Sequence, residues 1–245
     1  MHHFFVKPEQ IGKQMIEITG GDVEHICNVL RMRVGEQLCI YDGAYREYVC
    51  HIASFGAGRV YAEIEQVCEQ KSELSSRLIL FQGLPKADKM DLIVQKAVEL
   101  GAFEIVPVRM KRCVVKWNGQ KEAAKVSRWN AIAESAAKQS GRAVIPEVRN
   151  IMDFSDALSL AQSLDAAFLP YERYGDVRQS KEQIQRLRPG QSIGVFIGPE
   201  GGMDEPEVEL AGQYGVCPIS LGRRILRTET AGLCALSILM FHLEQ

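Results

Sequence analysis

The fold is decided by residues 192–202, which read Ser192-Ile193-Gly194-Val195-Phe196-Ile197-Gly198-Pro199-Glu200-Gly201-Gly202. The first six residues form a mostly apolar run that predicts a buried strand, and the run stops at a turn with three glycines and a proline. Asp204, Pro206 and Glu207 then supply an N-cap, a first-turn proline and a capping-box carboxylate, which predicts a helix from residue 205. This order is typical of open α/β sheets, which bind ligands at such loops.

A second stretch repeats the pattern. Residues 215–220 form another short run, followed by Leu221-Gly222-Arg223-Arg224-Ile225-Leu226-Arg227-Thr228-Glu229-Thr230-Ala231. Arginines ahead of a helix N-terminus are unfavourable for the helix dipole, whereas a first-turn glutamate is favourable. That local cost favours a use such as gripping phosphate, with solvated surface charge as the plain alternative. Neither glycine loop carries the Gly-Lys-Ser/Thr of a P-loop or a G-x-G-x-x-G dinucleotide signature.

Predicted strands and helices alternate through the rest of residues 74–245, which favours a mostly parallel sheet covered by helices on both faces. The strands are expected at 78–82, 104–108, 144–148, 166–169, 193–197 and 216–220. The helices are expected at 88–100, 122–139, 154–164, 181–187, 205–214 and 230–243. The inward face of the first helix is expected to carry Met90, Ile93, Val94, Ala97 and Val98, and Gly101 is expected to end it.

Residues 1 to about 70 show shorter segments that alternate between apolar and polar. Residues 37–41 and 47–52 flank an Asp-Gly turn, and residues 59–64 alternate again, which predicts a small antiparallel sheet or barrel. One short helix is expected at 21–29, with Asp22 as its N-cap. The polar segment 69–76 is typical of a linker, so the chain is expected to divide into domains at 1–73 and 74–245.

Composition narrows the classes of protein. No apolar stretch reaches the ~18 residues of a membrane span, and the first residues lack a signal-peptide pattern, so a cytoplasmic location is expected. Seven scattered cysteines without a C-x-x-C pair indicate reduced thiols, and five histidines without H-x-x-x-H spacing indicate no metal site. Net charge is −4 over residues 1–73, +7 over 74–149 and −5 over 150–245. The basic middle can attract phosphate, with solvated helix faces as the alternative.

The two C-terminal motifs together carry a family resemblance. Residues 196–202 and 220–231 resemble the 16S ribosomal RNA uracil-N3 methyltransferases, members of the SPOUT superfamily, and residues 25–36, 86–101 and 139–142 match as well. The resemblance implies an N-terminal PUA-like β-barrel for RNA, a C-terminal α/β domain with a trefoil knot, S-adenosylmethionine as methyl donor, and a homodimer. Two positions depart from the family's pattern: His3 stands where arginine is usual, and Lys138 where an acidic residue is frequent.

The resemblance and the chemistry of the reaction together predict roles for individual residues. Arg227 is expected to steady the anion that forms on uracil, with Glu229 orienting it or accepting the N3 proton. The cofactor is expected to contact, largely through backbone and apolar groups, Leu169, Pro170, Ile197, Gly198, Pro199, Glu200, Gly201, Gly202, Leu221, Gly222, Ile225, Leu226 and Ala231. The cations expected to hold 16S rRNA, within the small ribosomal subunit, are Arg31, Arg33, Lys86, Lys89, Lys96, Arg142, Arg223 and Arg224.

Two other functions stay open at this point. A SPOUT enzyme could methylate another acceptor, such as a ribose 2′-hydroxyl or a different base. A catalytically silent RNA-binding or ribosome-assembly factor is the second alternative. Intact glycine loops disfavour it, because a protein without a cofactor has no reason to keep backbone clearance at both loops.

Overall fold

In the computed structural model, which describes residues 1–69, 72–115 and 119–244, the chain forms two compact units. The first contains Met1–Glu73 and Ala137–Ile145, and the second contains Leu74–Ala136 and Pro146–Gln245. Residues 137–145 therefore group with the N-terminal segment although the sequence pattern assigns them to the C-terminal domain. The domain boundary near residue 73 stays a prediction.

The first unit is built on a curled sheet with the strand order β1-β3-β4-β5-β2. The pairs are antiparallel except β1–β3, and a register shift between Ile52 and Ser54 interrupts the long β4–β5 hairpin. Such irregularities increase local twist and help a sheet to curl around its core. The strands are β1 (His2–Phe5), β2 (Met15–Thr19), β3 (Gln37–Tyr41), β4 (Arg46–Gly56) and β5 (Arg59–Glu69). The predicted small β-domain is confirmed.

The helix predicted at 21–29 differs from its expectation. It is a short α-helix, α1 (Gly21–Glu24), that continues as a π-helical turn, η2 (His25–Val29). A separate single turn of 3-10 helix, η1 (Pro8–Gln10), lies earlier in the chain. The N-cap of α1 is Gly20, at a φ of +77°, and not Asp22. The carboxylate of Asp22 instead makes an ion pair with Lys138 at 2.8 Å, so a tertiary contact has displaced the local capping role.

The second unit is a parallel sheet with the strand order β12-β10-β11-β6-β7-β8, in which β9 also pairs with β7. The strands are β6 (Arg77–Gly83), β7 (Ala102–Arg109), β8 (Glu147–Val148), β9 (Met152–Asp153), β10 (Ala166–Pro170), β11 (Ser192–Ile197) and β12 (Cys217–Ile219). The helices are α2 (Lys89–Glu99), α3 (Gly119–Ser140), α4 (Phe154–Ala161), α5 (Val177–Gln185), α6 (Glu205–Gln213) and α7 (Thr228–Leu243).

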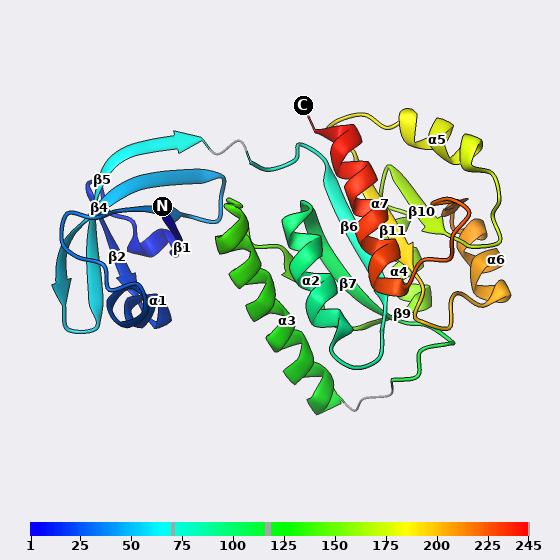
Figure 1. Ribbon diagram of the computed structural model, residues 1–245, viewed down its shortest axis with the longest axis horizontal. Helices are drawn as coiled ribbons and strands as arrows, with labels where there is room; N and C mark the ends of the chain where they lie inside the picture. The colour runs from blue at the N-terminus through cyan, green and yellow to red at the C-terminus, as the bar shows by residue number, and fades with distance from the viewer. Residues whose placement is uncertain (70–71, 116–118, 245) are drawn as a thin grey trace. The chain divides into compact units, whose positions relative to one another are not determined.

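Helices cover both faces of this sheet, as the sequence predicts (Figure 1). On one face Phe81 of β6 stacks on Phe196 of β11, with ring centroids 4.3 Å apart, and this pair lies in one core with residues of α4 and α6. On the other face α7 packs on β6 and β11 beside α2. The alternation of inward side chains along each strand produces these two cores. The α/β fold class is therefore confirmed, whereas the knot stays an expectation of the resemblance.

Many element boundaries differ from the predicted ones by a few residues, and three of these differences affect the description of the fold. The strand expected at 144–148 shrinks to β8, the helix expected at 181–187 lies at 177–185, and the last helix begins at Thr228 instead of Thr230. Asp176 explains the second shift, because its carboxylate accepts a hydrogen bond from the backbone N–H of Gln179 and caps the helix earlier.

Candidate functional site

The candidate site is a pocket of about 310 Å³ at the carboxyl ends of β10 and β11, closed by the loop that leads into α7. This is the edge at which parallel sheets bind ligands, and the volume lies at the lower end of small-molecule pockets. Its lining consists of Lys89, Pro170, Glu172, Ile197, Gly198, Pro199, Glu200, Gly201, Gly202, Met203, Ile225, Leu226, Arg227, Thr228 and Ala231. The structure thus brings together most of the residues predicted to contact the cofactor.

The turn after β11 is tight enough to require glycine. A Cβ on Gly198 would lie 3.1 Å from the carbonyl carbon of Gly202 and from the backbone nitrogen of Met203. Gly202 has a φ of +69°, in the left-handed region that residues with a Cβ adopt at a cost. Both glycines line the pocket, so a ligand there meets backbone instead of side chains.

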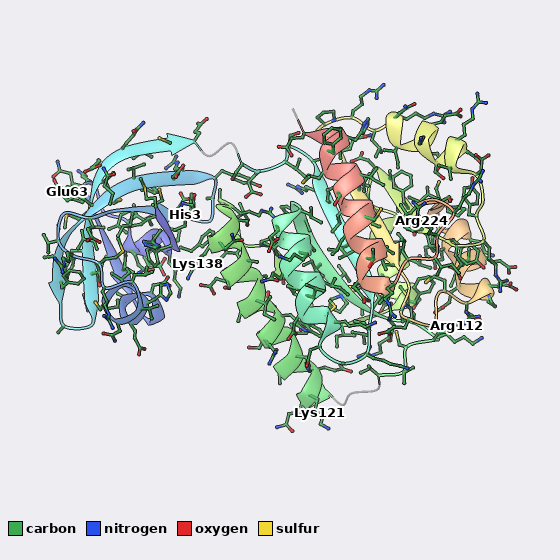
Figure 2. The ribbon with its side chains drawn as sticks, in the orientation of Figure 1. His3, Glu63, Arg112, Lys121, Lys138 and Arg224 are labelled. Atoms are coloured by element: carbon green, nitrogen blue, oxygen red, sulfur yellow. The ribbon has the colours of Figure 1, made fainter. Side chains whose placement is uncertain are left out.

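Arg112, which sequence analysis missed, clamps this turn from the loop after β7 (Figure 2). Its guanidinium donates to the carbonyl of Gly201 at 2.9 Å and to the carboxylate of Asp204 at 3.1 Å. Lys111 donates to the other oxygen of Asp204 at 2.6 Å, and this hydrogen bond lowers the pKa of Asp204. Asp204 is the N-cap of α6, as predicted, and its backbone N–H donates to Glu207 in the capping box. The clamp therefore ties the glycine turn to a capped helix start.

A buried polar chain joins the same turn to α7. Gln82, fully buried on β6, donates from Nε2 to the hydroxyl of Thr228 at 2.9 Å, and Thr228 donates to the carbonyl of Gly198 at 2.6 Å. Thr228 is the first residue of α7. The hydroxyl thus sets the spacing between the two loops that form the pocket.

Lys89 lines the pocket and makes ion pairs with two carboxylates. Its Nζ lies 3.1 Å from Glu200 and 3.2 Å from Glu229. The hydrogen bond to Glu200 raises the pKa of Lys89, against the effect of its desolvation, and Glu229 adds to the rise. Burial works to raise the pKa of Glu200, but hydrogen bonds from its own backbone, from the N–H of Lys86 and from Lys89 lower it overall.

Glu229 lies beside the pocket, and the role predicted for it stays a prediction. Among the described residues that line the pocket are Lys89, Arg227 and Thr228, but not Glu229. Its carboxylate lies against Lys89, which favours a role in holding that cation over direct contact with a bound base. Arg227 is the exposed N-cap of α7 and lines the pocket as expected.

Two smaller hollows adjoin the pocket. One, of about 80 Å³, is lined in part by Leu221, Gly222 and Leu226, and the other, of about 230 Å³, by Arg223 and Arg224. Arg224 lies on the loop that leads into α7 (Figure 2). The pocket and both hollows share Ile225 and Glu172, and Ile225 is 86% exposed. Leu169, also predicted to contact the cofactor, is a buried core residue of β10.

Sequence analysis gave Glu172 no role. Its carboxylate reaches the glycine turn, since a Cβ on Gly202 would lie 3.3 Å from its Oε1. The signal that could have found it is its position two residues after a strand that ends at the ligand-binding edge of the sheet.

The predicted RNA-binding cations are scattered. The first unit exposes Arg31 and Arg33. In the second unit, Lys86 is exposed in the loop before α2, and Lys96 lies on α2 itself. Lys96 makes an ion pair with Glu99 one turn further along α2, at 2.7 Å. Arg142 contradicts its prediction, because it is buried and forms a double hydrogen-bonded ion pair with Glu73. A guanidinium held in this way is part of the packing of the first unit and not a phosphate ligand.

The two departures from the family's pattern contact each other. His3 Nδ1 lies 3.2 Å from the carbonyl oxygen of Lys138, and the ammonium of Lys138 pairs with Asp22 (Figure 2). All three residues belong to the first unit. His3 therefore has a packing role within this unit.

Two further properties concern the whole described part of the chain. Within residues 1–69, 72–115 and 119–244, no cluster of three or more His, Cys, Asp or Glu side chains is arranged to hold a metal ion. None of the helices within these ranges combines the length and hydropathy that a bilayer crossing requires.

Comparison with known proteins agrees with this geometry. Residues 72–240 match the model of an RNA methyltransferase domain, and residues 18–65 match that of an RNA methyltransferase PUA domain. The chain is 36% identical to ribosomal RNA small subunit methyltransferase E of Bacillus subtilis, over 100% of this chain and 98% of the relative. It is 30% identical to the protein of the same name from Mesomycoplasma hyopneumoniae, over 97% and 98%.

A solved structure shows the same likeness in three dimensions. A ribosomal RNA small subunit methyltransferase E from Neisseria gonorrhoeae, bound to S-adenosyl methionine, superposes with a TM-score of 0.84. The two sequences are 31% identical, and the match covers 98% of this chain and 97% of that chain. The chain belongs to the family of ribosomal RNA small subunit methyltransferases E.

Proposed function

We propose that this protein transfers a methyl group from S-adenosylmethionine to N3 of one uridine in 16S rRNA of the small ribosomal subunit. The observation that carries the proposal is the pocket at the glycine turn, in a chain whose relative from N. gonorrhoeae binds S-adenosyl methionine. The absence of a membrane-crossing helix among the described residues is compatible with work in the cytoplasm.

The residues of the pocket fit this cofactor. The Gly198 turn leaves backbone groups open to the ligand, and Ile225 and Leu226 offer apolar surface for an adenine ring. Glu172 supplies a carboxylate to a ligand with a sulfonium and an ammonium charge. The remaining contacts are those predicted from the sequence, through the backbone of Pro170, Ile197, Pro199, Glu200, Gly201, Leu221 and Ala231.

The residues around the acceptor have one main chemical task. When bound, the cofactor supplies an electrophilic methyl group. Uracil N3 carries a proton and is a poor nucleophile until that proton leaves, so the site must stabilise negative charge on the base. Arg227 at the start of α7 is the cation that we assign to this charge, and Glu229 supports the site through its ion pair with Lys89.

RNA is held by both units in this proposal. The N-terminal unit, with a boundary near residue 73, contributes Arg31 and Arg33, and the C-terminal unit contributes Arg223 and Arg224 beside the pocket. N3 of a base-paired uracil is inaccessible, so the target nucleotide must be unpaired or flipped into the site. Binding through these cations should weaken as salt rises; a flat salt response would contradict it.

The working form in this proposal is a homodimer. The last turns of α7 expose Phe241, at 84%, and Ile238, three residues apart on one helix. Exposed apolar side chains of this size favour burial against a second copy. Sedimentation should show a dimer for the natural protein and a monomer for Phe241→Asp; a monomeric natural protein would refute this part.

One assay tests the reaction. The purified protein is incubated with methyl-labelled S-adenosylmethionine and small ribosomal subunits from cells that lack the enzyme, and the RNA is digested to nucleosides. Label in 3-methyluridine supports the proposal. Label in another nucleoside would refute the proposed acceptor atom and would support S-adenosylmethionine as the methyl donor. Calorimetry with S-adenosylmethionine separates both from a silent assembly factor, which would bind none.

A further inference from the structure

We propose that Lys89 is a second catalytic cation: its ammonium group, fixed between Glu200 and Glu229, stabilises the negative charge on O2 or O4 of the target uracil. The inference rests on the proposed function, and it gives Lys89 a different role from the phosphate contact that its sequence position predicts. It also gives Glu229 the role of a positioning residue.

The first support is the way in which Lys89 is held. The two ion pairs, at 3.1 and 3.2 Å, come from two different elements, the glycine turn after β11 and the first turn of α7. The side chain of Lys89 is 28% exposed and lines the pocket. A lysine that grips RNA phosphate gains from a long, solvated and mobile side chain. Two partners of opposite charge instead fix this ammonium and compete with any phosphate.

The second support is the charge around the pocket. Glu200 and Glu172 line it, and Glu229 lies directly behind Lys89. A uracil that loses its N3 proton brings further negative charge to this place. The single charge of Lys89 lies against two of the three carboxylates and offsets one of the three negative charges; without Lys89 all three would repel the anion. Prearranged cations at the position where charge develops are among the largest contributions to enzyme catalysis.

The chemistry balances without another reactant. The N3 proton passes to solvent water, and its electron pair stays on the base, where O2 and O4 share the charge beside Lys89 and Arg227. The N3–CH3 bond then forms while the carbon–sulfur bond of the donor breaks, and that electron pair remains on sulfur. Lys89 keeps its proton throughout and acts by charge alone.

The test compares Lys89→Met and Lys89→Arg with the natural protein. The matched control is Lys125→Met, a lysine on α3 whose side chain is 31% exposed and forms an ion pair with Asp88 at 3.6 Å. The substrate is the RNA in which the natural protein forms 3-methyluridine. It is transcribed either with uridine or with 5-fluorouridine, whose N3 proton is more acidic because fluorine withdraws electrons. Cofactor affinity is measured by calorimetry, and RNA affinity is measured as a function of salt.

We expect Lys89→Met to lower kcat on uridine RNA by about 10²- to 10³-fold, the loss typical when one group that stabilises a developing anion is removed. The loss should shrink on 5-fluorouridine RNA, because an anion that forms more readily depends less on the cation. Lys89→Arg should recover part of kcat, and Lys125→Met should leave both kcat and cofactor affinity unchanged. Lys89→Arg carries the same comparison if the methionine variant does not fold.

Other outcomes overturn the inference. If Lys89→Met lowers RNA affinity and reduces the salt slope by about one, Lys89 grips phosphate. If it weakens cofactor binding as much as it lowers kcat/KM, the lysine only shapes the cofactor pocket. An equal loss on both RNAs would also exclude a role in stabilising the anion. If the natural protein makes no 3-methyluridine, the proposed function fails instead, and that result is visible before any variant is compared.

Discussion

Replacing Thr228 with valine removes one hydroxyl group and changes the shape of the side chain very little. In the structure this hydroxyl accepts from buried Gln82 at 2.9 Å and donates to the carbonyl of Gly198 at 2.6 Å. The valine variant leaves the Gln82 amide one acceptor short and the Gly198 carbonyl without this donor. A polar group left unsatisfied inside a protein costs about 1–3 kcal/mol. We therefore expect the free energy of unfolding to fall by about this amount, which lowers Tm by roughly 2–4 °C for each kcal/mol in a chain of this size.

Urea unfolding of Thr228→Val, Thr228→Ser and Thr230→Val measures this effect. Serine keeps the hydroxyl, so Thr228→Ser should keep most of the stability that Thr228→Val loses. Thr230 is exposed on the same helix, so Thr230→Val should leave the stability nearly unchanged. Adding Gln82→Leu to the valine variant should cost less than the sum of the two single changes, since neighbours in one hydrogen-bonded chain are coupled. Cofactor affinity should fall with the valine variant, because the hydroxyl also fixes the two loops of the pocket. A valine variant as stable as the natural protein would refute this reasoning.

Two further predictions concern titratable groups. The hydrogen bond from Lys111 is the largest cause that lowers the pKa of Asp204. The contribution of this carboxylate to stability is therefore complete above its ordinary pKa near 3.8 and is lost as the pH falls through the lower pKa of the folded state. Asp204→Asn should flatten this loss of stability at acid pH in a pH series of thermal melts. Burial raises the pKa of Cys39 and of Cys50 to about 12. A thiol reagent at pH 8 should therefore label exposed Cys217 and leave Cys39 and Cys50 unlabelled until the protein unfolds. Mass spectrometry of the labelled peptides measures this difference.

Local patterns in the sequence predict much of this fold. The capping box at Asp204, the glycine turn before it and the inward face of α2 depend on neighbours within a few residues. Sequence reasoning therefore finds them. Because β10, β11 and β12 run parallel, the two glycine loops lie at one edge of the sheet, which is where the pocket lies.

Other features depend on contacts between distant parts of the chain. Arg112 meets Gly201, and Gln82 meets Thr228, across 89 and 146 residues. A buried glutamine in a strand or an arginine after one carries no local mark of such a partner. Arg142 shows the opposite error, because its basic neighbourhood indicates RNA whereas Glu73 neutralises it inside the first unit. Side-chain charge alone thus does not separate a packing cation from a binding one.

The exposure of Ile225 at the mouth of the pocket has a calorimetric consequence. This side chain is 86% exposed and borders the pocket and both adjoining hollows. A ligand that fills them removes its apolar surface from water, and such burial gives binding a negative change in heat capacity. The enthalpy of cofactor binding should therefore become more favourable as temperature rises, with a smaller slope for Ile225→Ala, so the temperature dependence reports on a surface that the affinity alone does not isolate.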